Sequence, residues 1–236
     1  MRVAAAQVTC VPADVRANIG RLAGLAGRAG ADSAELIVFP ELAVTGYELA
    51  AIAADERLWL RADDPRLDPL RTTGIATVVN CAAPALDGRR PIIATYVYGA
   101  DGDLLTCYHK QHLFGEEQRW FTAADKDGRF ELRGLRFSLA TCFDNHFPGL
   151  VGRIADDGCD VHLASALYGT GGGVAERASI YPDIAARADV YVVLANHVGR
   201  AGPVIGCGRA AVWSPGGALL VQADEQTPMI VTAEIV

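Results

Sequence analysis

The stretch LRFSLATCFDNHF, residues 135–147, places a cysteine where an apolar run gives way to polar residues. The run up to Thr141 has the length and composition of a buried strand, and the polar patch DNH follows Cys142 closely. A cysteine that only fills the core is typically found inside such a run, whereas a thiol at the end of a strand can meet a ligand. Cys142 is therefore a candidate reactive group, with a buried structural cysteine as the ordinary alternative.

The sequence around this stretch predicts a layered fold of strands and helices. Residues 147–157 have a helical pattern that ends at Gly158, and the apolar run CDVHLASAL follows directly. A strand, a helix and a second strand in this order are typical of α/β folds. Turn residues at 100–103 (ADGD) and 215–217 (PGG) add two antiparallel hairpins. We therefore expect an α/β class fold with mixed sheets of the α+β kind.

Two further helices and one surface segment are expected. Asp14 can cap a helix that extends to about Ala29. Residues 176–189 are also helical in pattern, although Pro182 within them predicts a late start or a kink. The segment 50–71 is charged and carries two prolines, which favours an excursion on the surface.

Composition limits the classes of protein that fit. The chain has 236 residues, of which 51% are hydrophobic and 21% charged, so it can bury a sizeable core. No linker, repeat or low-complexity segment divides it, so we expect one domain over residues 1–236. The formal net charge of -7 argues against a nucleic-acid partner. No apolar run approaches the roughly 20 residues of a transmembrane helix, so no membrane partner is expected.

The N-terminus and the cysteines indicate a cytoplasmic protein. The opening stretch MRVAAAQVTCV is short and interrupted by Gln7 and Thr9, which favours a first strand over a signal peptide. The six cysteines include no CxxC pair, and a chain of this length needs no disulfide framework. We therefore expect reduced thiols in a reducing cytoplasm.

Three reactive side chains follow three different apolar runs. Glu41 comes after ELIVFP, Lys110 after LLTCYH and Cys142 after FSLAT. Ligand sites in layered α/β folds gather at strand ends, so these groups can share one pocket. There the carboxylate could accept the proton of the thiol, and the ammonium could stabilise the thiolate and a developing oxyanion. Taken singly, a helix cap, a solvated lysine and a core cysteine are the ordinary explanations.

Together these segments resemble the nitrilase superfamily of carbon-nitrogen hydrolases, and the resemblance runs nearly end to end. IVFPELAVTGY is similar to the glutamate motif of that family, YGADGDLLTCYHKQHLFGEE to its lysine motif and LATCFDNHFPGLVG to its cysteine motif. The resemblance implies a four-layer α-β-β-α sandwich and a catalytic triad of Cys142, Glu41 and Lys110. It also implies a second glutamate near the nucleophile, a place that Glu117 fits better than Glu116.

The same resemblance implies cysteine-dependent hydrolysis of a small amide to a carboxylic acid and ammonia or an amine, through an acyl-thioester. No metal or organic cofactor is needed, and a homodimer or higher homo-oligomer is expected. The backbone N–H of Phe143 could complete an oxyanion hole. His146 and Arg177 are candidate partners for a substrate carboxylate, and Tyr168 and Trp120 are candidate pocket walls, although core packing is the default for both aromatics.

Several alternatives stay open on the sequence. The residues after the cysteine are Phe-Asp, where true nitrilases tend to carry Trp-Glu, so an amidase or an N-carbamoyl hydrolase is favoured over a nitrilase. His109 and His146 stand where the family commonly has arginine, which leaves the branch of the family undecided. A non-catalytic binding or assembly module on the same scaffold is a further class.

Other side chains suggest weaker hypotheses. A metal site could use His109 and His112 with a neighbouring glutamate, but histidines three apart on a strand would point to opposite faces. A papain-like pair would serve the cysteine with His162 or His197, although both lie in apolar runs where packing is the commoner role. The run GTGGG at 169–173 lacks the Lys-Ser/Thr of a phosphate loop and is expected to form a flexible rim above the pocket.

Overall fold

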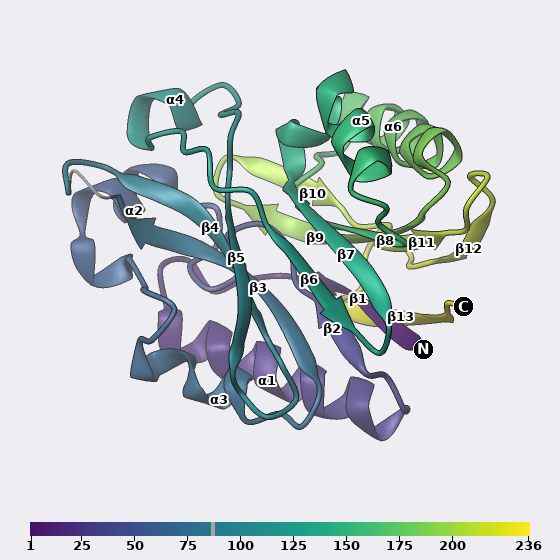
Figure 1. The fold of residues 1–236 in the computed structure, drawn as a ribbon. Coiled ribbons are helices and arrows are strands. Elements are labelled where there is room, and N and C mark those ends of the chain that lie inside the picture. The colour runs from purple at the N-terminus through teal and green to yellow at the C-terminus, as the bar shows by residue number, and fades with distance from the viewer. Residues whose placement is uncertain (86–87) are drawn as a thin grey trace.

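The structure is a computed structural model that describes residues 1–85 and 88–236 (Figure 1). Thirteen strands form one mixed sheet. They are β1 (Arg2–Val8), β2 (Leu36–Val38), β3 (Ala76–Pro84), β4 (Pro91–Tyr98), β5 (Leu104–His109), β6 (Arg129–Leu132), β7 (Leu135–Thr141), β8 (Val161–Ala166), β9 (Tyr191–Ala201), β10 (Val204–Cys207), β11 (Ala211–Trp213), β12 (Leu219–Gln222) and β13 (Met229–Glu234). The helices are α1 (Val15–Ala31), α2 (Leu49–Ala54), α3 (Asp68–Arg71), α4 (Glu117–Trp120), α5 (Pro148–Asp156) and α6 (Gly172–Ala188), with 3₁₀ turns η1 (Glu56–Leu58), η2 (Pro65–Leu67) and η3 (Cys142–His146).

The sheet bends back on itself, so that its two halves pack face to face. Its strand order is β5-β4-β3-β2-β1-β9-β8-β7-β6. The halves join where β1 and β9 pair over only two positions, Gln7 with Asn196 and Val8 with His197. Apolar side chains from β1 to β4 and from β7 to β9 form one cluster between the halves, which includes Val38 and Leu163. These contacts make the two inner layers of a sandwich.

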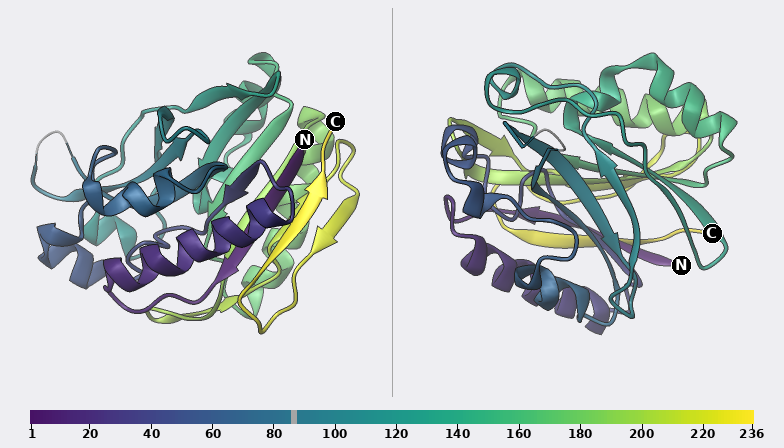
Figure 2. Two further views of the ribbon diagram at one scale, coloured as in Figure 1. Left: turned by 90° about the horizontal axis from the view of Figure 1, so that it is seen from below. Right: turned by 60° about the vertical axis from the view of Figure 1, so that its left-hand side comes forward.

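Helices cover the two outer faces and complete four layers. Helices α1 and α3 lie on the half that contains β1 to β5, and α5 and α6 lie on the half that contains β7 to β9 (Figures 1 and 2). Strands β1 and β13, at the two ends of the chain, pair antiparallel and lie side by side (Figure 2). The α/β class and the α-β-β-α layering expected from the sequence are thus confirmed.

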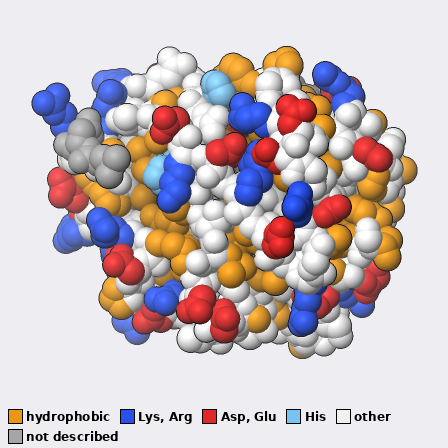
Figure 3. All heavy atoms as spheres, in the orientation of Figure 1, with side chains coloured by type: hydrophobic (Ala, Val, Ile, Leu, Met, Phe, Trp, Pro, Cys, Tyr) orange, Lys and Arg blue, Asp and Glu red, His pale blue; other side chains and the backbone are white. Residues whose placement is uncertain are grey.

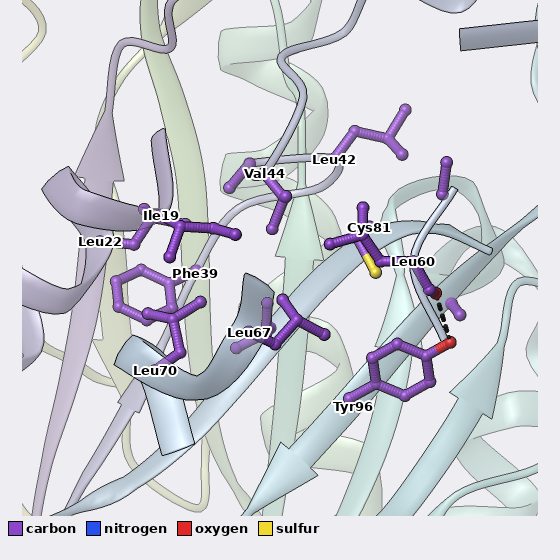
Figure 4. Close-up of a cluster of buried hydrophobic side chains, with 14 of the residues drawn as sticks. Ile19, Leu22, Phe39, Leu42, Val44, Leu60, Leu67, Leu70, Cys81 and Tyr96 are labelled. Atoms are coloured by element: carbon purple, nitrogen blue, oxygen red, sulfur yellow. Dashed lines mark hydrogen bonds between the residues drawn. The ribbon is translucent and has the colours of Figure 1, made fainter. Parts of the chain in front are cut away.

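The outer core on the α1 side shows why this helix forms here. Ile19 and Leu22 on one face of α1 pack with Phe39 and Leu70 (Figure 4). Burying each such side chain contributes about 2 kcal/mol. The helix begins as predicted, because the Asp14 side chain accepts a hydrogen bond of 2.9 Å from the Ala17 N–H.

The hairpins and one more predicted helix agree with the structure, and a third helix differs. Helix α5 falls within the predicted range 147–157, and β4–β5 and β11–β12 form the expected hairpins. Helix α6 begins at Gly172, earlier than the predicted residue 176, with Pro182 inside it. The prediction of a late start is therefore wrong. Three glycines, at residues 171–173, lie shortly before the predicted start. Because glycine has no side chain, these residues show no helical pattern of polar and apolar side chains.

The segment 50–71 is more buried than the sequence suggested. It contains several short helical turns, and its leucines Leu60, Leu67 and Leu70 are fully buried, while Arg61 stays exposed. The hydroxyl of Tyr96 donates a hydrogen bond of 2.9 Å to the Leu60 carbonyl (Figure 4). The expected surface excursion therefore holds for exposed residues such as Arg61, but the leucines that alternate with them close the outer core.

The surface carries charged side chains of both signs. On the face shown in Figure 3, basic and acidic side chains are interspersed rather than gathered by sign. Among the described residues, no helix is both long enough and apolar enough to cross a membrane.

Candidate active site

Glu41, Lys110 and Glu117 meet in one buried cluster beside Cys142. Glu41 follows β2, Lys110 follows β5 directly and Glu117 begins α4. The Lys110 ammonium lies 2.7 Å from Glu41 Oε1, and 2.8 and 2.7 Å from Oε1 and Oε2 of Glu117. All three side chains are fully buried or within one per cent of it. Groups that are far apart in the sequence therefore form one hydrogen-bonded unit.

Glu117 is fixed on both of its oxygens. Besides Lys110, its Oε1 accepts a hydrogen bond of 2.6 Å from the Tyr47 hydroxyl, and its Oε2 accepts one of 2.8 Å from the Phe114 N–H. Glu116, the neighbouring candidate, is largely exposed, with 72% of its side chain accessible. The structure thus brings Glu117 rather than Glu116 to the lysine, in a position to orient Lys110.

Glu41 differs from Glu117, because one of its carboxyl oxygens accepts no hydrogen bond. Its Oε1 accepts from Lys110, whereas its buried Oε2 has no hydrogen-bond partner among the described residues. A buried acceptor without a donor is costly and marks a place for a proton or a ligand group. Oε2 is therefore the oxygen of Glu41 that can receive a proton.

Burial and charge together set the protonation of this cluster. Burial raises the pKa of Glu41 to about 8; Lys110 opposes the rise and Glu117 adds to it. Burial alone would lower the pKa of Lys110, but the two carboxylates outweigh it and raise that pKa above its usual value. Burial and the charge of Glu41 also raise the pKa of Cys142 well above the usual thiol value. The resting site therefore holds a charged ammonium beside a neutral thiol.

Cys142 opens a tight turn in a strained conformation. Its φ is +46°, which lies in the left-handed region that residues with a side chain rarely adopt. The Asn145 side chain donates a hydrogen bond of 2.9 Å to the Cys142 carbonyl, and His162 bonds Asn145 Oδ1 at 2.8 Å. The other ring nitrogen of His162 lies 2.9 Å from Ser138 Oγ. This chain of contacts holds the turn in place.

The histidines of the papain-like alternative have other partners. Both ring nitrogens of His162 are engaged, and burial lowers its pKa to about 3. His197 Nε2 lies 2.6 Å from the Glu41 carbonyl oxygen, and burial lowers the pKa of His197 to about 4. His162 thus holds the Asn145 side chain and His197 the backbone at Glu41, and Glu41 is the candidate base.

Asp144 joins two segments of the site, and the sequence analysis did not single it out. Its Oδ2 accepts from the Tyr108 hydroxyl at 2.6 Å, and its Oδ1 accepts from the His112 N–H at 2.7 Å and the Gln111 N–H at 3.2 Å. The Asp144 side chain is buried. One carboxylate therefore ties the loop after Lys110 to the turn that begins at Cys142, and its place directly after the reactive stretch was the available signal.

We expect Asp144→Asn to destabilise the fold by about 2–3 kcal/mol. If the amide oxygen takes the place of Oδ1, the amide nitrogen takes the place of Oδ2, where it cannot accept from the Thr141 N–H that now donates at 3.3 Å. Urea unfolding measures this loss, and amide turnover should fall with it because the nucleophile and lysine segments lose their tie. Asp156→Asn, at an exposed position of α5, is the matched control. Equal stability of Asp144→Asn and the unaltered chain would show that the tie contributes nothing.

Cys142 opens into a cavity of about 240 Å³. The lining residues are Tyr47, Phe114, Cys142, Phe143, His146, Leu167, Tyr168, Gly169, Gly173, Glu176 and Val204. Phe143, His146 and Tyr168 thus lie at the cavity, and two glycines of the 169–173 run form part of its wall. Larger hollows of about 400, 440 and 550 Å³ exist, but their linings contain none of the clustered reactive groups.

Two candidates from the sequence lie outside this cavity. Arg177 is 2% exposed and packs over the Trp213 ring at 5.4 Å, so it does not reach a substrate carboxylate there. Trp120 is likewise absent from the lining, and Arg119 covers its ring at 4.5 Å. Both hypotheses are therefore wrong. In α6, Arg177 points toward the core, whereas its neighbour Glu176 lines the cavity.

The metal hypothesis has no support in the geometry. Within residues 1–85 and 88–236, no three His, Cys, Asp or Glu side chains are grouped to hold an ion. His112 instead lies 3.0 Å from Asp144 Oδ1 and stacks on Phe147 at 3.5 Å.

The structure is similar to solved structures of an amidase. An amidase from Nesterenkonia AN1, of the nitrilase superfamily, has a TM-score of 0.91 and 26% identity, and the match covers 100% of this chain and 92% of that one. Solved forms of that amidase include a complex with butyramide and an adduct of acrylamide at the active-site cysteine.

Two proteins that are similar in sequence are a nitrilase and an amidase. A nitrilase of Pyrococcus abyssi is 29% identical over 228 residues, or 92% of this chain and 83% of that protein. The 2-oxoglutaramate amidase of Bacillus subtilis is 30% identical over 145 residues, or 57% of this chain and 53% of that protein. The profile of the family described as carbon-nitrogen hydrolase matches residues 2–236. The chain therefore belongs to the carbon-nitrogen hydrolase family.

Proposed function

We propose that this protein hydrolyses a small amide to a carboxylic acid and ammonia or an amine, with Cys142 as nucleophile. The observation that carries the proposal is the buried ammonium of Lys110 between the side chains of Glu41 and Glu117, beside a thiol that opens into a cavity. A buried charged cluster of this kind is costly, and a binding module would gain nothing from it. Similarity to an amidase whose complex with butyramide is known also supports an amide substrate.

In the proposed mechanism, Glu41 acts as the general base and acid. Its unoccupied Oε2 takes the proton of the Cys142 thiol, and the sulfur attacks the amide carbonyl carbon. Glu41 then gives that proton to the leaving nitrogen as the C–N bond breaks, which leaves an acyl-thioester. Water attacks the thioester, its proton passes through Glu41 back to the thiol, and the carboxylic acid departs.

Two groups stabilise the oxyanion that forms in each half-reaction. Phe143 is the second residue of η3, where backbone N–H groups have no partner within the turn. Lys110 adds a positive charge, and Glu117 fixes its position through two short contacts. Removing one oxyanion donor typically costs about 3 kcal/mol of barrier. Glu117 thus acts through Lys110, as a positioning residue.

An ammonia-release screen tests the substrate class. Aliphatic amides, N-carbamoyl compounds and nitriles are compared, with Cys142→Ala protein as the blank. We expect the short aliphatic amides to be turned over fastest, because the cavity of about 240 Å³ suits a few heavy atoms. Turnover of carbamoyl compounds or nitriles alone would favour those alternatives, and no thiol-dependent turnover of any class would favour the non-catalytic module.

We expect kcat/KM for the amide to fall as the pH decreases below about 8. Glu41 accepts a proton only when ionised, and burial raises its pKa to about 8, so the active fraction declines at lower pH. Rate profiles between pH 5 and 9.5 measure this. In Glu117→Gln the midpoint should move to lower pH, because the negative charge of Glu117 is one cause of the raised pKa. A flat profile down to pH 5.5 in the unaltered enzyme would contradict the assignment of Glu41.

A cytoplasmic location and a homodimeric or larger assembly remain predictions. All six cysteines are free, which supports a reducing compartment. Light scattering coupled to gel filtration measures the assembly directly.

A further inference from the structure

The cavity at Cys142 has an uneven distribution of charge. Among the described residues that line it, Glu176 is the only carboxylate and none is lysine or arginine. The rest of the lining is mainly aromatic, aliphatic or glycine. A substrate tail in this cavity therefore meets one negative side chain and no positive one.

Glu176 lies in the early part of α6 and remains available to a ligand. Its side chain is 47% exposed, and its Oε1 lies 3.5 Å from Nε2 of His146. Burial lowers the pKa of His146, although Glu176 opposes the change, so at pH 8 the ring is neutral and leaves the carboxylate uncompensated. The Tyr168 hydroxyl lies 3.3 Å from the same ring nitrogen, which holds the imidazole at the cavity wall.

Aromatic side chains also line this cavity. The ring of Phe143 lies 5.1 Å from that of Phe114 and 5.0 Å from that of His146, and all three belong to the lining. Aromatic faces attract ammonium groups through their quadrupole, and a carboxylate at the rim adds a directed ion pair. Together they favour a positive group and repel a negative one, which is a basis for specificity.

We propose that Glu176, supported by His146, recognises an ammonium group on the substrate, so that the preferred substrates are short amides with a positively charged acyl end. This inference rests on the proposed function and names its substrate class. It also excludes amides that carry a carboxylate at the acyl end. That sets this chain apart from the 2-oxoglutaramate amidase to which it is similar, whose named substrate is such an acid.

Three amides of nearly equal length test the proposal at pH 8: β-alaninamide (cation), butyramide (neutral) and succinamate (anion). We expect kcat/KM to fall at least tenfold from the cation to the neutral amide, and again to the anion. In Glu176→Gln the cation-to-neutral ratio should approach one, and in Glu176→Arg the anion should become the better charged substrate. Asp183→Asn, a 57% exposed position of the same helix outside the cavity, should keep the original ratios. Equal rates for β-alaninamide and succinamate would overturn the proposal.

A second measurement works without turnover. Aminoethyl and sulfonatoethyl methanethiosulfonate carry opposite charges on similar frames, and each forms a mixed disulfide with a thiolate and releases methanesulfinate. Peptide mass spectrometry follows Cys142, with the partly exposed Cys10 and Cys107 as internal references. We expect Cys142 to favour the cationic reagent over the anionic one by a larger factor than the reference cysteines do, and Glu176→Gln to remove that difference.

The two readouts separate the two ideas. Charge-selective labelling without hydrolysis of any amide would overturn the proposed function and support the cation site. Hydrolysis of amides with no effect of Glu176→Gln on either ratio would leave the proposed function standing and overturn the cation site.

Discussion

Cys142→Ala should lower amide turnover by about 10⁴-fold or more, the scale seen when a catalytic nucleophile is removed. Among the described residues that line the cavity, Cys142 carries the only thiol, and the hydroxyl groups in the lining belong to tyrosines whose pKa burial raises. No other side chain can therefore take over the attack. Ammonia release measures the loss. Mass spectrometry of the quenched enzyme should show an acyl adduct on the unaltered chain and none on the variant.

Cys142→Ser is expected to be nearly as inactive. An alcohol holds its proton far more tightly than a thiol, so a carboxylate base with a pKa of about 8 ionises it poorly. The control is Cys107→Ala, which makes the same chemical change at a cysteine that lines a separate hollow. Turnover by Cys142→Ala at the rate of this control would show that the nucleophile lies elsewhere.

Three reactive residues of the site could be predicted because each lies just after the end of a strand. Glu41, Lys110 and Cys142 each come directly or nearly so after an apolar run, and layered α/β folds bring strand ends together. The choice of Glu117 over Glu116 came from the lysine motif. The apolar runs therefore predicted the α/β class and a pocket at the strand ends, whereas the triad and the four layers were implied by the resemblance to the family.

The contacts between distant segments could not be predicted in this way. Asp144 bonds the Tyr108 hydroxyl across 36 positions of sequence, and no local pattern says which loops will meet. The error at Arg177 has a similar cause. Adjacent residues on a helix point about 100° apart, so an uncertain start for α6 leaves open which of Glu176 and Arg177 faces the cavity. The glycines at the start of that helix carry no side chain from which its register could be predicted.

Glu41→Gln should abolish activity and at the same time stabilise the fold. Without a carboxylate the thiol has no base, and the loss of general base catalysis lowers turnover by about 10³-fold. The stability effect follows from the pKa of Glu41, which is about 8 in the folded protein against 4.5 for the free side chain. Between these values the unfolded chain has released the proton while the folded chain retains it. The folded state of the unaltered chain therefore becomes less stable as the pH rises from about 4.5 to about 8.

Glutamine removes this dependence because it does not ionise. Lys110 keeps both contacts to Glu117, and the amide oxygen of the variant can replace Glu41 Oε1 as its third acceptor. We therefore expect the variant and the unaltered chain to be similar near pH 5 and the variant to be more stable by about 2–4 kcal/mol at pH 9. Urea unfolding at the two pH values measures the difference, and Glu116→Gln at the exposed neighbouring glutamate is the control. A variant that is less stable at pH 9 would mean that Lys110 needs Glu41 as an ionised partner, and Glu41 could then not carry the raised pKa on which its role as base depends.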